Sequence, residues 1–285
     1  MLYCIMAILW IFFLDYRKIA LIPLLYGHYA GNNKSFPDFV LKEKRLIYMG
    51  SKYRIAKYIL PIILKDRKEG QYFVEPFCGG CNSLDKVANP RMGNDSNKYL
   101  IALLKELQTQ IPFNPPHIGE KEYKDIQHNK EKYPDWLVGY AGFNLSFAAK
   151  FFGGYRRDKA GVRNYENEAQ QNILAQQNLL AGIEFSCLDY RSLHIPDGSI
   201  VYCDPPYKGT TGYKDKFDHS AFYTWVKEKS KINTVFVSEY NMPDFAECVW
   251  EKEVYHILHP CRSSNLDVLS VGKKQTEKLF RIKDV

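Results

Sequence analysis

The tetrapeptide Asp204-Pro205-Pro206-Tyr207 combines the residue types that a catalytic turn needs. It follows an apolar run, residues 200–203, which predicts a buried strand with the tetrapeptide at its carboxyl end. Because prolines lack N–H donors and have a fixed φ, the turn is expected to be rigid, with carbonyls that accept from outside the chain. The exocyclic amine of a nucleobase fits this arrangement: the Asp204 carboxylate and the Pro205 carbonyl accept its two hydrogens, and the Tyr207 ring stacks on the base. A plain Pro-Pro turn would explain neither the acid nor the aromatic residue.

A second candidate segment, Phe73-Val74-Glu75-Pro76-Phe77-Cys78-Gly79-Gly80, predicts a short strand over residues 71–77 that enters a glycine turn. Glycines let a backbone approach a ligand closely, and an acid at the end of the next strand can accept hydrogen bonds from ribose hydroxyls. Asp95 lies 20 residues after Glu75, as expected of such an acid. Because the G-x-G-x-x-G signature is absent, a dinucleotide site, an S-adenosylmethionine (AdoMet) site and a plain tight turn all stay open.

Metal and redox chemistry find no support in the sequence. Cys78-x-x-Cys81 offers two thiolates, but no second C-x-x-C or suitably spaced histidine pair completes a tetrahedral site. The seven histidines form no H-x-x-x-H or H-x-E pattern, so we expect no metal. The seven cysteines are too scattered for a disulfide framework, which favours a reducing, cytoplasmic location.

Length and composition are those of one catalytic unit that carries an insertion. The chain has 285 residues, 46% hydrophobic and 25% charged, which excludes a disordered or collagen-like protein. The excess of 39 Lys and Arg over 32 Asp and Glu gives a net charge of +7, which mildly favours a polyanionic partner.

Residues 1–44 do not match the rest of the chain. Residues 1–14 and 19–26 are apolar, but each run is shorter than the roughly 20 residues that a membrane span needs, and no signal-peptide pattern is present. We expect an apolar extension or a start codon assigned too far upstream, with a monotopic membrane anchor as the alternative.

From residue 45 onward, strand and helix patterns alternate, which predicts an α/β fold with a mainly parallel sheet and ligands at the carboxyl ends of its strands. The expected strands are residues 71–77, 91–95, 183–187, 199–203 and 234–238. The expected helices are residues 51–65, kinked or split at Pro61, a helix after the glycine turn, and residues 98–107 and 219–230. Residues 249–258 and 277–282 are expected to form a terminal hairpin.

Residues 112–181 differ in character, because prolines break their periodicity and aromatic residues, glycines and cations follow. We expect a loop insertion, which is where specificity usually lies in such scaffolds. Its DNA-binding candidates are the most concentrated cations near aromatic residues: Lys150, Tyr155, Arg156, Arg157, Lys159 and Arg163. Most would contact phosphates and one arginine could read a guanine edge, whereas the alternative is a solvated charged face.

Over residues 46–282 the sequence resembles the Dam-type (class α) DNA adenine-N6 methyltransferases, particularly those of phages and prophages. The resemblance is most specific at Asp204-Pro205-Pro206-Tyr207, and is supported at Tyr48-Met49-Gly50-Ser51-Lys52, at residues 75–80, at Asn94-Asp95 and at Cys187-Leu188-Asp189-Tyr190. It implies a Rossmann-like AdoMet-dependent sheet formed by residues 45–111 and 182–285, with residues 112–181 as an inserted target-recognition subdomain.

The resemblance also implies roles for single residues. Tyr48 and Lys52 would approach the methionine part of AdoMet, and Asp95 would hold the ribose. Phe77, Cys78, Gly79 and Gly80 would wrap the cofactor, and Asp189 or its neighbours would meet the adenine.

The implied reaction is direct transfer of a methyl group to the N6 amine of an adenine flipped out of double-stranded DNA, with Asp204, Pro205, Pro206 and Tyr207 as the catalytic turn. No metal is needed. Residues 208–213 would form a loop that closes over the base, and the protein would be a monomer or weak dimer.

Three alternatives remain. An N4-cytosine methyltransferase attacks through the same kind of amine, although that group usually opens its catalytic turn with Ser. A dinucleotide-dependent oxidoreductase would leave the Asp-Pro-Pro-Tyr turn unexplained, and a non-catalytic DNA-binding module would need neither site. Ser238-Glu239-Tyr240 resembles a Ser-Asn position of the family, and Glu239 receives no role.

Overall fold

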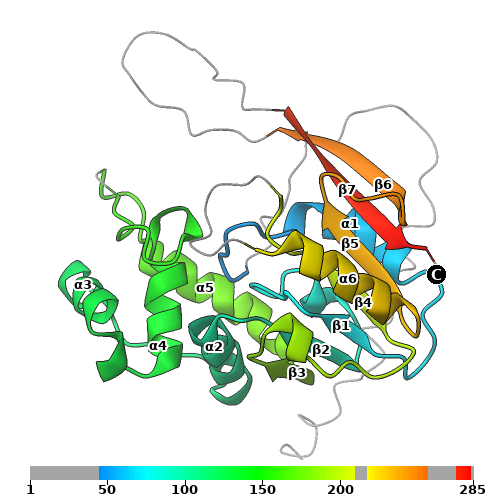
Figure 1. Cartoon of the computed structure of the whole chain (residues 1–285). Helices are drawn as coiled ribbons and strands as arrows, with labels where there is room; N and C mark the ends of the chain where they lie inside the picture. Colours follow the sequence, from blue (N-terminus) through cyan, green and yellow to red (C-terminus); the bar gives the residue numbers. More distant parts are fainter. Residues whose placement is uncertain (1–44, 159, 209–216, 256–273, 284–285) are drawn as a thin grey trace, which may run out of the picture. The chain divides into compact units, whose positions relative to one another are not determined.

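The computed structural model describes residues 45–158, 160–208, 217–255 and 274–283, and these belong to one compact unit, Glu43–Val285 (Figure 1). The expectations for residues 1–44, for Lys159 and for most of the loop at 208–213 lie outside the described residues. The α-helices are α1 (Tyr53–Ile63), α2 (Lys98–Thr109), α3 (Glu120–His128), α4 (Asp135–Gly139), α5 (Tyr165–Gln177) and α6 (His219–Ser230). The strands are β1 (Phe73–Glu75), β2 (Arg91–Asn94), β3 (Ile183–Ser186), β4 (Ile200–Cys203), β5 (Thr234–Glu239), β6 (Ala246–Tyr255) and β7 (Lys274–Ile282).

The seven strands form one sheet in the order β3-β2-β1-β4-β5-β7-β6. The first five in this order run parallel, and β7 pairs antiparallel with both β5 and β6. The expected mostly parallel sheet with a terminal antiparallel hairpin is therefore confirmed. Because parallel strands end at the same edge, the segments after β1, β2, β3, β4 and β5 all begin at one side of the sheet.

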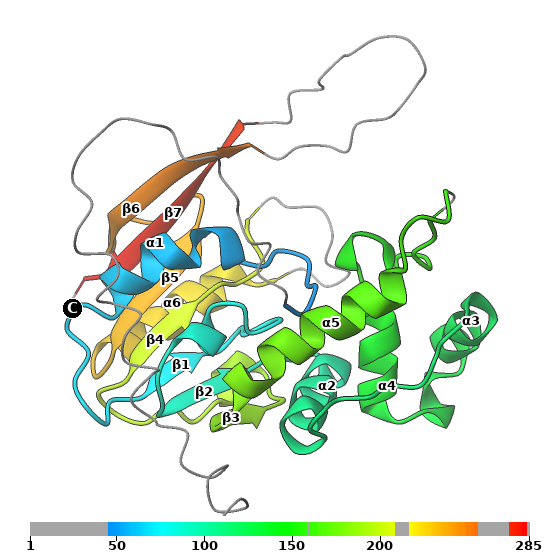
Figure 2. The ribbon, with the colours of Figure 1, turned by 180° about the vertical axis from the view of Figure 1, so that it is seen from behind.

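Alternating side chains of the central strands pack on opposite faces of the sheet. Phe73, Tyr202 and Phe236 point to the face that α1 and α2 cover, whereas Val74, Val201 and Val237 point to the face that α6 covers. Figure 1 shows α6 in front of the sheet, and the reverse view in Figure 2 shows α1 in front of it. Helices thus cover both faces of the central strands. This packing holds the strands in place, so the position of the residue that follows each strand is fixed as well.

Two expected helical features are not found. The first helix is not split at Pro61, since one α-helix runs from Tyr53 to Ile63 with the proline in its last turn, whereas a kink there stays a prediction. After the glycine turn there is no α-helix but one 3-10 turn, η3 (Leu84–Lys86). The connection to β2 is short and ends in Asn89-Pro90, and a residue before proline avoids the helical conformation.

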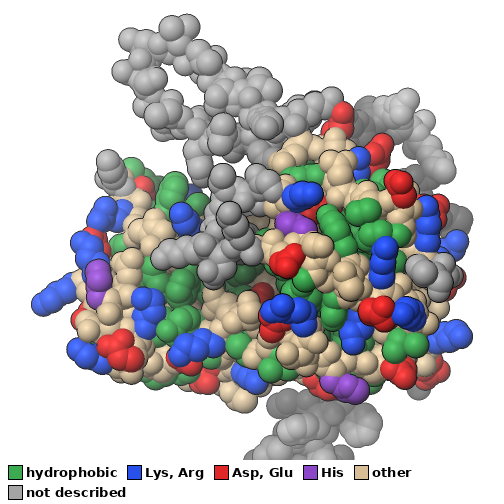
Figure 3. All heavy atoms as spheres, viewed as in Figure 1, with side chains coloured by type: hydrophobic (Ala, Val, Ile, Leu, Met, Phe, Trp, Pro, Cys, Tyr) green, Lys and Arg blue, Asp and Glu red, His purple; other side chains and the backbone are tan. Residues whose placement is uncertain are grey.

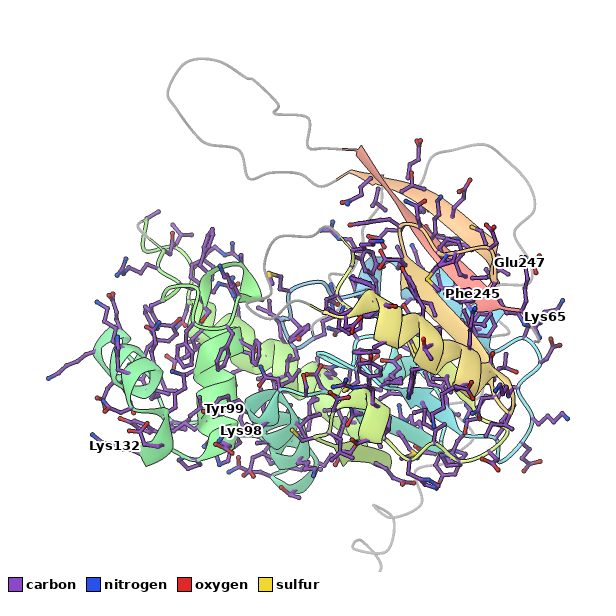
Figure 4. The ribbon with its side chains drawn as sticks, viewed as in Figure 1. Lys65, Lys98, Tyr99, Lys132, Phe245 and Glu247 are labelled. Carbon is purple, nitrogen blue, oxygen red and sulfur yellow. The ribbon has the colours of Figure 1, made fainter. Side chains whose placement is uncertain are left out.

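The insertion is not a loop, since it contains α3, α4 and α5 together with short turns. These are the 3-10 turns η4 (Lys130–Lys132), η6 (Phe147–Ala149) and η7 (Asn178–Leu180) and the π-helical turn η5 (Tyr140–Asn144). Its α4 packs beside α2, where Lys98 pairs with Asp135 at 3.1 Å and the Tyr99 ring stacks on Phe151. Figure 4 labels Lys98 and Tyr99 at the start of α2. The insertion is therefore joined to the sheet domain through α2. None of the helices in the described part of the chain is both long and apolar enough to cross a membrane.

Candidate active site

Asp204 directly follows the fully buried strand β4, at the carboxyl edge of the sheet. Its side chain is 21% exposed, and Oδ1 lies 3.4 Å from Nζ of Lys52. Burial raises the pKa of Asp204 from 3.8 to about 6, although the Lys52 ammonium acts in the opposite direction. The carboxylate is thus ionised at neutral pH but poorly solvated, which makes it a strong hydrogen-bond acceptor.

Lys52 caps the start of α1 and points at the catalytic turn. Its Nζ lies 3.3 Å from Oε2 of Glu277 and 4.2 Å from the centre of the Tyr207 ring. Burial opposes a charge on Lys52, yet the Asp204 and Glu277 carboxylates together raise its pKa above the ordinary value. Its ammonium contacts the catalytic turn and Glu277 of β7, so an approach of Lys52 to the methionine part of a cofactor stays a prediction.

Tyr207 is buried, and it is held from two sides. Its hydroxyl donates to Oε2 of Glu277 at 2.9 Å. Its ring meets Tyr240 edge-to-face, with 4.5 Å between the ring centres. The turn that Pro205 and Pro206 stiffen is therefore anchored to the terminal hairpin and to the segment after β5.

Asp95 directly follows β2 and is tied to the glycine turn. Its carboxylate accepts hydrogen bonds from the backbone N–H of Gly79 at 3.2 Å and of Asn97 at 2.9 Å. Burial raises the pKa of Asp95, and these two hydrogen bonds oppose the rise. An ionised carboxylate has about four acceptor positions, so Asp95 keeps capacity for a ligand's hydroxyl groups.

The glycine turn packs directly against Tyr48. Gly79 has φ +49°, and a Cβ there would lie 2.8 Å from Cε1 of Tyr48. A Cβ on Gly80 would lie 2.8 Å from Cβ of Tyr48. The other side of Tyr48 contacts Phe143 of the insertion, with 5.4 Å between the ring centres. The two glycines therefore serve close packing between the turn, Tyr48 and the insertion.

Phe77 belongs to an aromatic cluster at the same edge. Its ring centre lies 5.1 Å from that of Tyr190, and Phe217 and Phe222 also contact it. Asp189, just before Tyr190, is exposed and pairs with Arg191 at 2.7 Å. The position after β3 agrees with a site for a base, but the Asp189 carboxylate is already engaged within its own turn.

Cys78 and Cys81 are buried free thiols, and burial raises the pKa of both. A neutral buried thiol is inert, so this pair packs the turn. Within the described residues no three His, Cys, Asp or Glu side chains gather as metal ligands would.

Sequence reasoning gave no role of their own to four residues of this edge. Asn94 donates to the carbonyls of Pro76 and Leu188 at 3.1 and 2.9 Å, which ties together the segments after β1 and β3. Glu239 accepts from the backbone N–H of Lys208 at 3.2 Å and holds the end of the catalytic turn. The other two are Glu277 and Glu75, whose buried carboxyl accepts from Ser83 at 2.7 Å.

Most described cations of the insertion have partners within the chain. Arg157 forms a two-pronged pair with Glu120, and Arg163 forms one with Glu168. Arg156 lies 4.2 Å above the Tyr165 ring, whereas the neighbouring Lys150 is exposed. Tyr155 donates its hydroxyl to the carbonyl of Ile118 at 3.0 Å. Figure 3 shows Lys and Arg side chains along the outer side of the insertion, interspersed with acidic ones.

A groove of about 620 Å³ runs along the hairpin. Its lining residues are Tyr240, Asn241, Glu251, Lys252, Glu253, Gln275, Thr276 and Lys278. It holds as many carboxylates as ammonium groups, and it touches the catalytic turn only through Tyr240.

A mainly parallel sheet with the glycine turn, Asp95 and the Asp-Pro-Pro-Tyr turn at one edge defines an α/β methyltransferase of the Rossmann-like kind. The D12 class N6 adenine-specific DNA methyltransferase family matches residues 48–137 and 120–258. The chain belongs to this family.

Curated relatives are more distant. The chain is 25% identical over 199 residues to the Type II methyltransferase M.FokI of Planomicrobium okeanokoites, which covers 60% of this chain and 30% of that protein. It is 24% identical over 207 residues to the modification methylase StsI of Streptococcus sanguinis, which covers 60% of this chain and 29% of that protein. The match thus spans less than a third of either relative.

Among solved structures, SMU.472, described as a methyltransferase complexed with SAH, matches 82% of this chain and 53% of its own. The identity is 13% and the TM-score 0.33, a likeness too distant to bear on function.

Proposed function

We propose that the protein transfers a methyl group from AdoMet to the N6 amine of an adenine in double-stranded DNA. The observation that carries the proposal is Asp204, a half-buried and poorly solvated carboxylate at the carboxyl end of β4, within a rigid turn and at the same edge of the sheet as Asp95 and the glycine turn. Membership of the family supports the same reaction.

The chain's residues would work mainly by positioning. Asp204 and the Pro205 carbonyl would accept the two N6 hydrogens, which turns the nitrogen lone pair away from the ring and toward the methyl donor. The bound AdoMet would supply an electrophilic methyl group: the new N6–carbon bond would form as the sulfur–methyl bond breaks, S-adenosylhomocysteine would leave, and the methylated amine would lose one proton. Asp95 would bind ribose hydroxyls with its remaining acceptor positions, and the rigid glycine turn would keep that carboxylate in place.

The finer assignments belong to the same proposal. We place the protein with the Dam-type enzymes of phages and prophages, acting in the cytoplasm on a base flipped out of the duplex. Residues 45–111 and 182–285 would form the catalytic domain, and residues 112–181 would recognise the target. The packing of Tyr48 between the glycine turn and Phe143 supports a working connection between the two.

The test is methylation of DNA by the purified protein with radiolabelled AdoMet, followed by digestion to nucleosides and chromatography. Label in N6-methyladenine is expected. Label in N4-methylcytosine would move the protein to the cytosine-specific group. No label in DNA, with tight binding of a nicotinamide dinucleotide, would favour the oxidoreductase alternative.

A further inference from the structure

We infer that Glu277, on the terminal strand β7, is a positioning residue for the methyl transfer proposed above: its carboxylate holds Lys52 and Tyr207 in place around Asp204. The role rests on the proposed function, and it gives the terminal hairpin a part in catalysis. Glu277 touches groups of the catalytic turn, whereas its own action on the substrate would be indirect.

A single carboxylate oxygen of Glu277 joins two elements of the site. Oε2 accepts from Nζ of Lys52 at 3.3 Å and from the hydroxyl of Tyr207 at 2.9 Å. The Glu277 side chain is only 10% exposed, and that of Lys52 only 12%. Hydrogen bonds to buried charged groups are strong and directional, so this oxygen fixes both side chains rather than merely attracting them.

The fold places Glu277 here through the register of the sheet. Strand β7 pairs antiparallel with β5, and Lys278 lies opposite Glu239, the last residue of β5. Glu277 therefore stands at the carboxyl edge of the parallel strands, where the catalytic turn begins. Lys52 and Glu277 are 225 positions apart in the chain, so their contact exists only because the hairpin closes this side of the sheet.

Glu277 also divides the attraction of Lys52 between two carboxylates. The Lys52 ammonium lies 3.3 Å from Glu277 and 3.4 Å from Asp204. Without a charge at Glu277, Lys52 would pair with Asp204 alone and would compete with the substrate amine for the same acceptor. Shared pairing keeps Asp204 available while Lys52 still limits the cost of its buried charge.

Several ionisable groups surround Asp204, and their effects have opposite signs. Burial raises the pKa of Asp204, Lys52 lowers it and Glu277 raises it further. The charged and ionisable groups that face Asp204, Lys52 and Glu277 come from several elements, and besides these three they include Glu75, Tyr202, Cys203, Tyr207, Glu239 and Tyr240. Removing the charge of Glu277 should therefore make Asp204 more acidic, whereas removing that of Lys52 should do the reverse.

The experiment compares wild-type protein with Glu277→Gln, which keeps an acceptor oxygen but loses the charge, and with Glu277→Ala. The matched control is Glu247→Gln, because Glu247 is an exposed carboxylate on β6 opposite Arg281, at the other end of the hairpin (Figure 4). Single-turnover methyl transfer is measured from pH 5 to 9. Binding of S-adenosylhomocysteine is measured by calorimetry.

For Glu277→Gln we expect the pH-independent single-turnover rate to fall about tenfold, because the catalytic turn would be misplaced. The affinity for S-adenosylhomocysteine should stay unchanged. The midpoint of the acidic limb should move to lower pH, whereas Lys52→Met should move it to higher pH. Glu277→Ala should lose more rate than Glu277→Gln, because it also removes the oxygen that accepts from the Tyr207 hydroxyl and leaves Asp204 as a hydrogen-bond partner of that hydroxyl. Wild-type rates and midpoint in Glu277→Gln would overturn the inference.

A second measurement separates this inference from the proposed function. The pH dependence of urea unfolding is compared for Glu277→Gln, Asp204→Asn and the double variant. If the effect of Asp204→Asn on the pH dependence of unfolding changes when Glu277 is neutralised, the two carboxylates are electrostatically coupled. This result would support the inference even if wild-type protein methylates no DNA. Independent, additive effects would overturn the positioning role whatever the protein's activity.

Discussion

Asp204→Asn should abolish most activity and at the same time stabilise the fold. The substitution keeps the size and shape of the side chain and removes its charge. Loss of a charged acceptor that acts in the transition state is expected to lower turnover about a hundredfold or more, or roughly 3 kcal/mol.

The gain in stability follows from the pKa of Asp204. In the folded chain it is about 6, compared with an ordinary value of 3.8, so the folded state favours the protonated acid. The associated stabilisation is fully present below about pH 4 and is lost as the pH rises through 6. A difference of about two pKa units corresponds to about 3 kcal/mol, which the ionised carboxylate costs the fold at pH 8. Asparagine, being neutral, avoids this cost.

Two assays check the pair of effects. Single-turnover transfer from radiolabelled AdoMet gives the rate, and urea unfolding at pH 4.5 and pH 8 gives the stability. The variant should be more stable than wild type at pH 8, with a smaller difference at pH 4.5. The exposed turn residue Asp197, changed to Asn, serves as the control. A variant that is less stable at pH 8, or that keeps wild-type turnover, would refute the assignment of Asp204 as a poorly solvated catalytic acceptor.

Two further predictions concern the cofactor edge and the insertion. Asp95→Asn should weaken binding of S-adenosylhomocysteine about tenfold in calorimetry, because its amide cannot accept from both Gly79 and Asn97; unchanged affinity would move the ribose role elsewhere. Lys150→Gln should lower DNA affinity and reduce the slope of its salt dependence by about one phosphate contact. Arg157→Gln should have a smaller effect, because Glu120 already holds Arg157. Equal slopes in the two variants would contradict this difference.

The sheet could be predicted from the sequence because its signals are local. Strand β4 is a short apolar run that Asp204 follows directly, and Asp95 follows the short strand β2, which ends in Gly93 and Asn94. Once the strands are parallel, both acids must lie at the same edge. That the glycine turn, Asp95 and the Asp-Pro-Pro-Tyr turn lie at one edge could therefore be predicted without knowledge of side-chain packing.

The prolines of the insertion led to the wrong prediction of a loop, because a proline interrupts a helix that precedes it but can stand directly before the start of another. Pro134 stands immediately before α4, where a missing N–H costs nothing. Local periodicity was thus interrupted between helices rather than within them. Where Pro61 does lie inside α1, the helix ends two residues later.

Long-range polar contacts were beyond the reach of spacing arguments. Glu277 lies within β7, a strand of mixed polar and apolar residues, and the sequence alone does not show which face or neighbour its carboxylate meets. Only the register of β7 against β5 brings it to Lys52. The ion pairs of Arg157 and Arg163 were missed for a related reason, since a cluster of cations in sequence does not show which acids the fold places beside them.

Gln176 offers a test of whether the insertion supports the cofactor edge. This buried side chain of α5 accepts from the backbone N–H of Leu46 at 2.9 Å and donates to the carbonyl of Gly80 and to Asp85, each at 3.0 Å. It therefore joins the insertion both to the segment that carries Tyr48 and to the glycine turn. Gln176→Leu leaves three buried polar groups without this partner, which should cost about 3 kcal/mol or more of unfolding free energy.

The adjacent Gln177 provides the matched control. It is equally buried, but it bonds to Phe113, Leu107 and Gln110, away from the glycine turn. Both leucine variants should lower the urea midpoint, because each strands buried polar groups. Among the molecules that remain folded, only those of Gln176→Leu should also bind S-adenosylhomocysteine more weakly, because this variant alone loses the hydrogen bonds to Gly80 and to the segment that carries Tyr48. Equal affinities of the two folded variants would mean that the insertion braces the fold without supporting the cofactor edge.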